Sequence, residues 1–306
     1  MTKIFIDGSA GTTGLRIRER LANRTGLDIL TLPEELRKDT EARRVALNSA
    51  DIAFLCLPDA AAREAVALID NPNTAVIDTS TAHRTADGWT YGFPELVGMG
   101  TIAASKRIAN PGCHASGFVA LVAPLVRAGL IAPDTRLTCF SLTGYSGGGK
   151  PMIAAYEAAD RDPLLGAPRQ YGLAQTHKHL PEMAAVCGLT HDPVFCPVVG
   201  DFYSGMEVTV PLHGADLRGT IEDIKAAYRQ TYMGTLVRLC VEADESGFLS
   251  AAAYSGRDDM ELTVHGNPDR ILLTARFDNL GKGASGAAIQ NMNILLGCDP
   301  TTGLVI

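Results

Sequence analysis

The chain lacks any long hydrophobic run and the sequence features of several other protein classes. No segment of its 306 residues approaches the roughly 18 apolar residues that a transmembrane helix needs. Residues 1–11 contain no apolar signal region after the single lysine, and none of the seven cysteines belongs to a CxxC pair. Internal repeats and low-complexity segments are missing too. These absences argue against a membrane protein, a disulfide framework and a metal site, and they favour a cytoplasmic location.

Positive charge is in deficit, which restricts the partners. Lysine and arginine number 27 against 34 aspartate and glutamate residues, so the formal net charge is −7. A negative protein repels phosphate backbones, and we therefore expect neither nucleic acid nor an anionic membrane as a partner. Small anionic metabolites remain compatible with a local basic site. The length suggests two domains, at about 100–200 residues each.

The pattern of apolar and polar residues predicts an α/β protein with two different parts. In the first third, short apolar runs alternate with amphipathic stretches, which is typical of a parallel sheet covered by helices on both faces. Later strands follow one another with fewer helices between them, which predicts a second, α+β domain. The predicted strands are 3–7, 27–32, 51–57, 74–78, 136–143, 194–199, 206–212, 235–241 and 271–277. The predicted helices are 15–23, 40–49, 60–69, 114–128, 152–161, 221–232 and 285–296.

A glycine-rich loop follows the first predicted strand and precedes the first predicted helix. It consists of Gly8, Ser9, Ala10, Gly11, Thr12, Thr13 and Gly14. The glycines follow the spacing GxxGxxG rather than GxGxxG, but the physical argument is the same. Glycine permits a tight turn and a close backbone approach, and a helix N-terminus attracts a pyrophosphate. A plain strand–helix turn is the alternative, and the position at the start of an alternating series favours a dinucleotide site.

The segment after the second predicted strand bears on the choice of cofactor. An acidic residue there would bind the ribose of NAD, and Glu34 or Glu35 is a candidate. A basic residue would bind the 2′-phosphate of NADP, and Arg37 and Lys38 are candidates. An exposed charged loop explains the same residues, so both choices stay open at this point.

One cysteine differs from the other six. Most of them lie in apolar contexts typical of a core, whereas Cys113 lies between a Pro–Gly turn and the start of a predicted helix. The positive end of a helix dipole favours the thiolate, which is the nucleophilic form. A capping residue without chemistry is the alternative. The context therefore makes Cys113 a candidate nucleophile.

A nucleophilic thiol needs a partner for proton transfer, and one segment supplies two histidines. His177 and His179 stand two residues apart, and we expect them on one side of an extended segment. Tyr171 lies upstream, where its hydroxyl would orient one of the rings. A metal pair or two surface histidines are the alternatives, and the metal has no obvious third ligand.

Taken together, these motifs resemble the N-acetyl-γ-glutamyl-phosphate reductase family in its shorter form, over nearly the whole chain. Besides the glycine loop, six segments carry the resemblance. They are DTSTAHR (78–84), YGFPEL (91–96), NPGC (110–113), SGGGK (146–150), THKHLPE (176–182) and KGASG with QNMN (282–286 and 290–293). Any one of them is a weak signal, but their number and order make the match specific.

The resemblance implies a fold, a reaction and an assembly. It implies a Rossmann-type dinucleotide-binding domain over residues 1–113 with 285–306. It also implies an α+β catalytic and dimerisation domain with a mixed sheet over residues 114–284. The expected activity is NADPH-dependent reduction of an acyl phosphate to an aldehyde through a cysteine thioester, in arginine biosynthesis. The implied cofactor is NADP(H), and the implied state is a homodimer or homotetramer.

The family's chemistry also assigns expected roles. Cys113 is the expected nucleophile and His177 the general acid/base, with Tyr171 orienting its ring and His179 as second choice. The expected cofactor contacts beyond the glycine loop are Ser80, Gly283 and Ser285. The expected substrate contacts are Arg84, Lys150, Asn110 and Glu182.

Three residues depart from the family pattern. His114 stands where the family usually has tyrosine, Lys150 where it has arginine, and His83 where it has an aromatic or aliphatic residue. Aspartate-semialdehyde dehydrogenase is the nearest rival, while the residues after Cys113 disfavour glyceraldehyde-3-phosphate dehydrogenase. A redox sensor that binds a nucleotide leaves the histidine segment unexplained, and a thiol hydrolase leaves the glycine loop unexplained.

Overall fold

The computed structural model describes residues 1–306, which form two compact units. The first unit comprises Met1–Gly112 with Ala284–Leu304, and the second comprises Cys113–Gly283 with Val305–Ile306. No helix combines the length and the apolar character that crossing a membrane would require.

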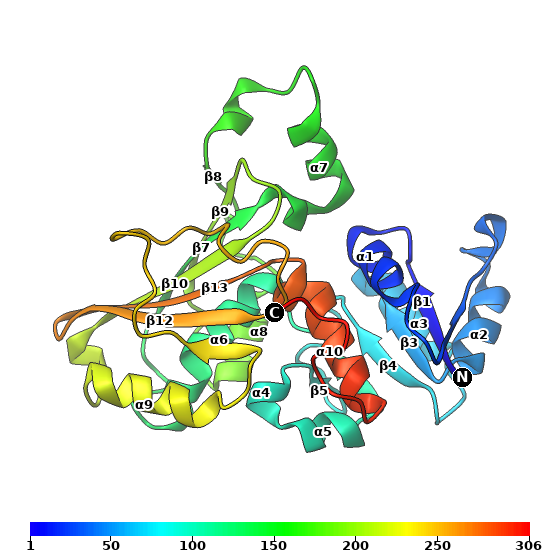
Figure 1. Ribbon diagram of the computed structural model, residues 1–306, viewed down its shortest axis with the longest axis horizontal. Helices are drawn as coiled ribbons and strands as arrows, with labels where there is room; N and C mark the ends of the chain where they lie inside the picture. Colours follow the sequence, from blue (N-terminus) through cyan, green and yellow to red (C-terminus); the bar gives the residue numbers. More distant parts are fainter. The chain divides into compact units, whose positions relative to one another are not determined.

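The first unit is built on a six-stranded parallel sheet (Figure 1). Its strand order is β2-β1-β3-β4-β6-β5. The strands are β1 (Thr2–Asp7), β2 (Leu27–Leu30), β3 (Ile52–Leu55), β4 (Ala75–Asp78), β5 (Thr90–Tyr91) and β6 (Arg107–Ala109). The helices are α1 (Thr12–Leu21), α2 (Thr40–Ser49), α3 (Asp59–Ala67), α4 (Pro94–Val97), α5 (Met99–Ala104) and α10 (Gly286–Leu295), with a 3₁₀ turn at Glu34–Leu36.

Helices cover both faces of this sheet because the side chains of a strand alternate. Ile4 and Ile6 pack on one face with Ile17 of α1 and Met292 of α10. Phe5, between them, packs on the other face with alanines and leucines of α2 and α3. The strand order reverses between β1 and β3, where doubly wound sheets bind their ligands. The predicted Rossmann-type fold is therefore confirmed.

A buried carboxylate organises the segment after β4. Asp78 accepts hydrogen bonds from the backbone and hydroxyl of Ser80 and pairs with Nδ1 of His83 at 2.6 Å. The His83 ring stacks on Trp89, with centroids 4.1 Å apart and planes 9° from parallel. His83 thus fills the place of an aromatic residue by stacking, while its ring nitrogen holds the carboxylate.

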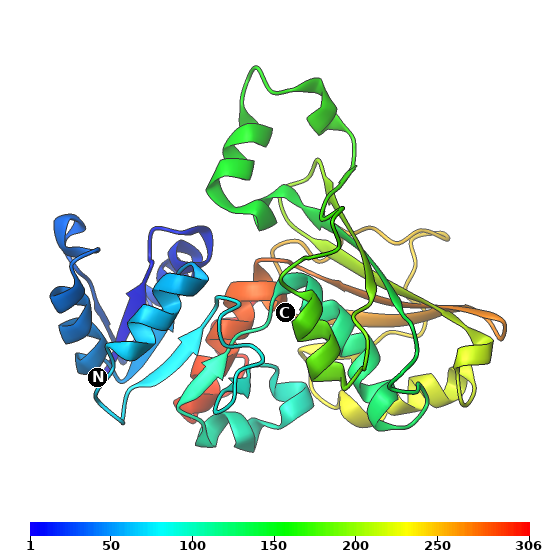
Figure 2. The same ribbon diagram turned by 180° about the vertical axis from the view of Figure 1, so that it is seen from behind.

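The second unit is built on a seven-stranded mixed sheet of order β11-β12-β13-β10-β7-β9-β8 (Figure 2). Most neighbours are antiparallel, but β7 pairs with β9 and β11 with β12 in parallel. The strands are β7 (Thr138–Gly144), β8 (Arg169–Gln170), β9 (Val194–Gly200), β10 (Met206–His213), β11 (Val237–Leu239), β12 (Met260–Asn267) and β13 (Arg270–Phe277). The helices are α6 (Cys113–Arg127), α7 (Gly149–Glu157), α8 (Leu180–Cys187) and α9 (Ile221–Thr231). Short turns lie at Tyr145–Gly148, Pro163–Gly166 and Gly214–Asp216, and a π-helical turn lies at Gly281–Ser285.

Helix α6 lies at the centre of this unit. Every residue from His114 to Leu125 is buried, because α6 packs on β10 and β13 and is flanked by α8 and α9. At Gly117 a Cβ atom would come within 2.6 Å of Val208 on β10, so glycine permits the close approach of helix and sheet. The opposite face of the sheet is more exposed: Val208 and Val210 are buried, whereas Pro211 is exposed.

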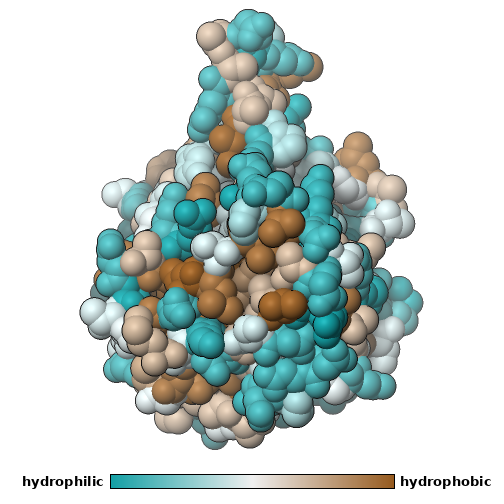
Figure 3. Space-filling model, turned by 90° about the vertical axis from the view of Figure 1, so that its right-hand side faces the viewer, coloured by the Kyte–Doolittle hydropathy of each residue, from teal (hydrophilic) through white to brown (hydrophobic).

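Segment 145–170, which contains α7, projects from the edge of the sheet beyond β8 and β9 (Figure 1). An edge contact between Tyr145 and Tyr203 and an ion pair between Arg161 and Asp201 tie it to the unit. Over the face of the molecule in Figure 3, hydrophobic residues form small groups interrupted by hydrophilic ones.

Every predicted element is present, with boundaries shifted by at most four residues. The strands β5, β6, β8 and β12 and the helices α4, α5 and α8 were not predicted. Strand β12 reads MELTVHGN, in which an acidic residue, a histidine and a glycine interrupt the apolar pattern. Helix α8 follows a histidine-rich turn and begins with Leu–Pro, and proline is tolerated in the first turn of a helix.

Candidate functional site

The glycine loop connects β1 to α1, and two of its glycines are sterically required. Gly8 has φ +85°, and a Cβ atom there would lie 2.2 Å from the carbonyl oxygen of Cys56. At Gly14 a Cβ atom would lie 2.5 Å from the carbonyl oxygen of Gly8. Gly11 is different, since a Cβ atom there meets only ordinary contacts at 3.5 Å or more. Packing does not require glycine at position 11, and a bare backbone there leaves room for a bound group.

Helix α1 presents its N-terminus to this loop without an internal capping group. Gly11 is the N-cap, no side chain caps the helix, and its first turn contains no acidic residue. Thr12 and Thr13 are its first two residues. The exposed N–H groups and the helix dipole therefore remain available to an anion.

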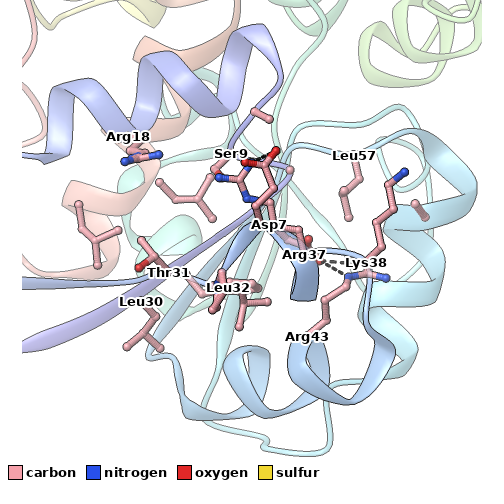
Figure 4. A pocket seen from close by; sticks show the side chains of 18 of the residues that line it. Asp7, Ser9, Arg18, Leu30, Thr31, Leu32, Arg37, Lys38, Arg43 and Leu57 are labelled. Atoms are coloured by element: carbon pink, nitrogen blue, oxygen red, sulfur yellow. Dashed lines mark hydrogen bonds and ion pairs between the residues drawn. The ribbon is translucent and has the colours of Figure 1, made fainter.

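A cavity of about 920 Å³ adjoins the loop in the first unit (Figure 4). Gly8, Ser9 and Ala10 line one part, and the chain after β2 lines another. All four residues weighed for cofactor choice line it: Glu34, Glu35, Arg37 and Lys38. The cavity thus brings the glycine loop together with the charged segment that follows β2, the arrangement expected of an adenosine site.

Four basic side chains surround this cavity, but they differ in their partners. Arg43 is buried and donates from Nε and Nη2 to Asp7, at 3.1 and 3.0 Å. Arg37 is only 3.7 Å from the exposed Glu34, a weak pairing. Arg18 and Lys38 make no ion pair. Arg43 is therefore committed to the protein, and Arg18, Arg37 and Lys38 are the cations available to a ligand.

The remaining predicted residues of the first unit are held in hydrogen bonds. The hydroxyl of Ser80 donates to Asp78. Arg84 is buried and donates from Nε to the carbonyl of Asn110 and from Nη2 to that of Thr79, each at 3.0 Å. The Asn110 amide donates to the carbonyl of Ala284 at 3.0 Å, and its oxygen accepts from Asn291. Ser285 is buried just before α10.

In the second unit, Cys113 is the first residue of α6, so its thiol lies at the positive end of the helix dipole. A Cβ atom at Gly283 would lie 3.1 Å from Cβ of Cys113 and 3.1 Å from the carbonyl oxygen of Asp278. Gly283 belongs to the π-helical turn at Gly281–Ser285. Such turns are frequent at functional sites, and here the missing side chain leaves space for the cysteine.

Tyr171 and His177 do not pair as the sequence suggested. The hydroxyl of Tyr171 lies 2.6 Å from Nε2 of His114, and the Tyr171 and His177 rings make only an edge contact. Nδ1 of His114 lies 2.7 Å from the hydroxyl of Ser141 on β7. The expectation that Tyr171 orients His177 is therefore wrong, because the buried His114 takes the hydroxyl.

The two histidines of the THKHLPE segment lie close together, but not on an extended chain. Their ring centroids are 4.7 Å apart and nearly perpendicular. His179 has helical dihedral angles (φ −85°, ψ −10°) and forms the N-cap of α8, so the prediction of an extended segment is wrong. The backbone N–H of His179 donates to Nδ1 of His177 at 3.2 Å. In the neutral ring of His177, the hydrogen is therefore carried by Nε2.

His114 lies at the centre of this cluster. The centroids of His177, His179 and Phe195 lie 5.7, 5.6 and 5.2 Å from its own. Burial, together with the charge of His177, lowers the pKa of His114 from 6.5 to about 3, so its ring is neutral at physiological pH. Burial, and after it the negative charge of a Cys113 thiolate, raise the pKa of Tyr171.

The structure does not bring every predicted residue of this unit into the cluster. Lys150 is exposed on α7, within the projecting segment. Glu182 is buried in the first turn of α8, three residues after His179. His114 and Ser141 were not predicted as site residues. The only sequence signal was the histidine directly after Cys113, where the resembled family has tyrosine.

Comparison with known proteins agrees with this arrangement. Residues 3–100 match the family described as semialdehyde dehydrogenase, NAD binding domain, and residues 113–279 match semialdehyde dehydrogenase, dimerisation domain. Solved structures of similar fold include aspartate semialdehyde dehydrogenase II from Vibrio cholerae (TM-score 0.72, 17% identity, 97% of this chain and 98% of that one). Another is aspartate semialdehyde dehydrogenase from Francisella tularensis (TM-score 0.71, 16% identity, 97% and 100%).

Curated relatives are much closer in sequence. N-acetyl-gamma-glutamyl-phosphate reductase from Mesorhizobium japonicum is 47% identical, over 96% of this chain and 99% of the relative. N-acetyl-gamma-glutamyl-phosphate reductase 2 from Pseudomonas putida is 46% identical, over 96% of each. Both relatives match along nearly their full length. The chain therefore belongs to the N-acetyl-γ-glutamyl-phosphate reductase family, within the semialdehyde dehydrogenases.

Proposed function

We propose that this protein reduces N-acetyl-γ-glutamyl phosphate to N-acetylglutamate semialdehyde and phosphate, with NADPH as the reductant. The observation that carries the proposal is 47% identity to a reductase of that name over 96% of the chain. The cysteine at the N-terminus of α6, next to a cluster of histidines, supplies the chemistry such a reaction needs. The reaction is a step of arginine biosynthesis.

The first unit fits a dinucleotide. Gly8 and Gly14 shape a turn that a side chain would block, and the uncapped N-terminus of α1 favours a pyrophosphate. Gly8, Ser9, Ala10, Gly11, Thr12, Thr13 and Gly14 would hold the pyrophosphate. We also assign Ser80 and Ser285 from the first unit, and Gly283 from the second, as cofactor contacts. Bound NADPH supplies the hydride that reduces the acyl group.

Selection of NADP over NAD depends on the cavity beside the loop. Arg37, Lys38 and Arg18 line it without a strong ion pair inside the protein. Glu34 and Glu35 are exposed, and Glu34 is already paired, weakly, with Arg37. Two or three available cations favour a 2′-phosphate, and we therefore assign this segment to NADP.

Cys113 acts as the nucleophile. Its thiolate sulfur attacks the acyl carbon, the C–O bond to phosphate breaks, and a thioester forms on the protein. After reduction the oxygen of the resulting thiohemiacetal loses its proton, the C–S bond breaks, and the aldehyde leaves while the thiolate is regenerated. Cysteine suits both steps because it is a good nucleophile and a good leaving group.

His177 moves the proton. The ring takes up the proton that the Cys113 thiol loses, and the resulting imidazolium donates a proton from Nε2 to the oxygen when the thiohemiacetal forms, since Nδ1 lies against the backbone N–H of His179. The same nitrogen takes the proton back when the C–S bond breaks. His179 is the alternative residue for this role, because its ring lies beside that of His177.

Arg84, Lys150, Asn110 and Glu182 are the proposed substrate contacts. Arg84 is held by two backbone carbonyls, which fixes the plane of its guanidinium. Lys150 offers an exposed point charge and lacks the planar fork of arginine. We assign these two cations to the phosphate and carboxylate groups of the substrate.

We further propose that the first unit binds the dinucleotide, while the second carries catalysis and assembles the protein as a homodimer or homotetramer. Phe140, Val194 and Leu272 project from the open face of the second sheet and are 40%, 57% and 45% exposed. The family match over residues 113–279 is to a dimerisation domain. An apolar sheet face of this kind is suited to contact with a second copy.

The reaction run in reverse tests the function. NADPH formation is measured spectroscopically from N-acetylglutamate semialdehyde and NADP⁺, with and without inorganic phosphate. We expect strict phosphate dependence, because phosphate must attack the thioester to release it. The Cys113→Ser variant should lose turnover and keep NADP(H) binding, since the thiol acts only in the chemistry.

Three outcomes would contradict the proposal. Turnover without phosphate would identify a hydrolytic aldehyde dehydrogenase. Turnover of aspartate semialdehyde alone would reassign the substrate. Full activity of Cys113→Ser would exclude the thioester.

A further inference from the structure

The hydrogen bonds around His114 form a chain with a defined direction. Ser141 and Tyr171 occupy the two nitrogens of one ring, Nδ1 at 2.7 Å and Nε2 at 2.6 Å. A neutral imidazole donates from one nitrogen and accepts at the other, so the two bonds cannot be chosen independently. The tautomer of His114 therefore decides which way the hydroxyl hydrogens of Ser141 and Tyr171 point.

Burial of Ser141 selects one tautomer. The Ser141 side chain is fully buried, and its hydroxyl has no partner other than His114. If Nδ1 carried the hydrogen, the Ser141 hydroxyl would accept it, and its own hydrogen would be left buried without an acceptor. A buried donor without a partner is costly, so Ser141 donates to Nδ1 and the ring carries its hydrogen on Nε2.

The tautomer of His114 also determines the direction in which the Tyr171 hydroxyl points its hydrogen. With hydrogen on Nε2, His114 donates to the phenolic oxygen, and the Tyr171 hydrogen must point away from His114. Tyr171 is only partly buried, and its hydroxyl lies 2.6 Å from the ring of His114, the residue that directly follows Cys113 at the start of α6. A hydroxyl held in this way is a preorganised donor for negative charge that develops there.

We propose that Ser141 and His114 are positioning residues that hold the Tyr171 hydroxyl as a hydrogen-bond donor to the acyl oxygen on Cys113. Tyr171 thereby stabilises the oxyanion when the thioester forms and when it is reduced. His114 transfers no proton itself and stays neutral throughout. This role rests on the proposed thioester reaction.

A double-mutant cycle separates this role from packing. Tyr171→Phe should lower kcat by about 100-fold, as expected for removal of one oxyanion donor. Ser141→Ala should lower kcat by about fivefold to tenfold with KM unchanged, because Tyr171 is then free to donate to His114. In the Tyr171→Phe background, Ser141→Ala should change kcat by less than about twofold. Ser141→Thr keeps the hydroxyl and should restore most of the activity.

A second measurement does not need turnover. In protein labelled with ¹⁵N-histidine, the ring shifts report which nitrogen of His114 carries the hydrogen, and the seven histidines are assigned with the His114→Gln variant. We expect hydrogen on Nε2 in the unsubstituted protein and loss of that preference in Ser141→Ala.

The outcomes distinguish this inference from the proposed function. If Nδ1 of His114 carries the hydrogen in the unsubstituted protein, the proposed chain of hydrogen bonds is wrong. It is also wrong if Ser141→Ala lowers kcat by the same factor in the unsubstituted protein and in the Tyr171→Phe variant. An unchanged kcat in Tyr171→Phe overturns the donor role. If the unsubstituted protein fails to turn over the semialdehyde while the ring signal is as expected, the proposed function fails and the hydrogen-bond chain stands.

Discussion

Burial of a neutral histidine beside the nucleophile should make the protein sensitive to acid. The pKa of His114 is lowered from 6.5 to about 3 in the folded chain. Between these values the unfolded chain binds a proton that the folded chain does not bind, so stability falls as the pH falls below about 6.5. At about pH 5 the loss from this one group is about 2 kcal/mol, because each unit of pH contributes about 1.4 kcal/mol.

The His114→Gln variant isolates this contribution. Glutamine is similar in length, keeps a hydrogen-bond donor and cannot titrate. Urea unfolding of both proteins is followed by far-ultraviolet circular dichroism at about pH 7.5 and about pH 5, at one protein concentration because assembly affects stability. The unsubstituted protein should lose about 2 kcal/mol more than the variant between the two conditions. Equal losses, within about 0.5 kcal/mol, would show that His114 is protonated in the folded state and would refute the argument.

Two further predictions concern proton transfer and the binding of NADPH. His177→Asn should lower kcat by about 100-fold or more, and His179→Asn by about tenfold, because His177 carries its hydrogen on Nε2 while His179 contributes a backbone donor to it. The opposite order in the same assay would move proton transfer to His179. Removing the cavity cations with Arg37→Ala and Lys38→Ala together should raise KM for NADPH by about 10- to 100-fold and change KM for NADH little, with Glu35→Gln as the control. An equal rise for both cofactors would place the 2′-phosphate elsewhere.

Local patterns were enough to predict the alternating part of the fold. Each of the first strands is a short apolar run next to a turn, and their side chains divide between two helix-covered faces as the alternation requires. Strand β12 was not predicted because its pairing with β13 accommodates a charged residue. Glu261 is buried and accepts hydrogen bonds from Arg276, its partner on the neighbouring strand. Such compensation between distant residues leaves no regular apolar pattern in β12.

In the candidate site, too, some residues could be predicted from the local sequence and others could not. Cys113 and the glycine loop could be identified because each depends on the turn or helix end beside it. The partner of Tyr171 could not be identified, because it depends on the β7–β9 pairing and on α6, which bring Ser141, His114 and Tyr171 together from positions 27 and 57 residues apart. The turn at His179 was missed because proline at the second position of α8 allows the helix to begin there.

The stack of His83 on Trp89 has a practical consequence. Trp89 is the only tryptophan in the chain and belongs to the first unit. Its indole packs against an imidazole 4.1 Å away and against the core formed with α2 and α3. Intrinsic tryptophan fluorescence is therefore a label-free probe of the first unit alone. A comparison of its transition with that of total helix content would reveal, without any engineered dye, whether the two units unfold together or one after the other.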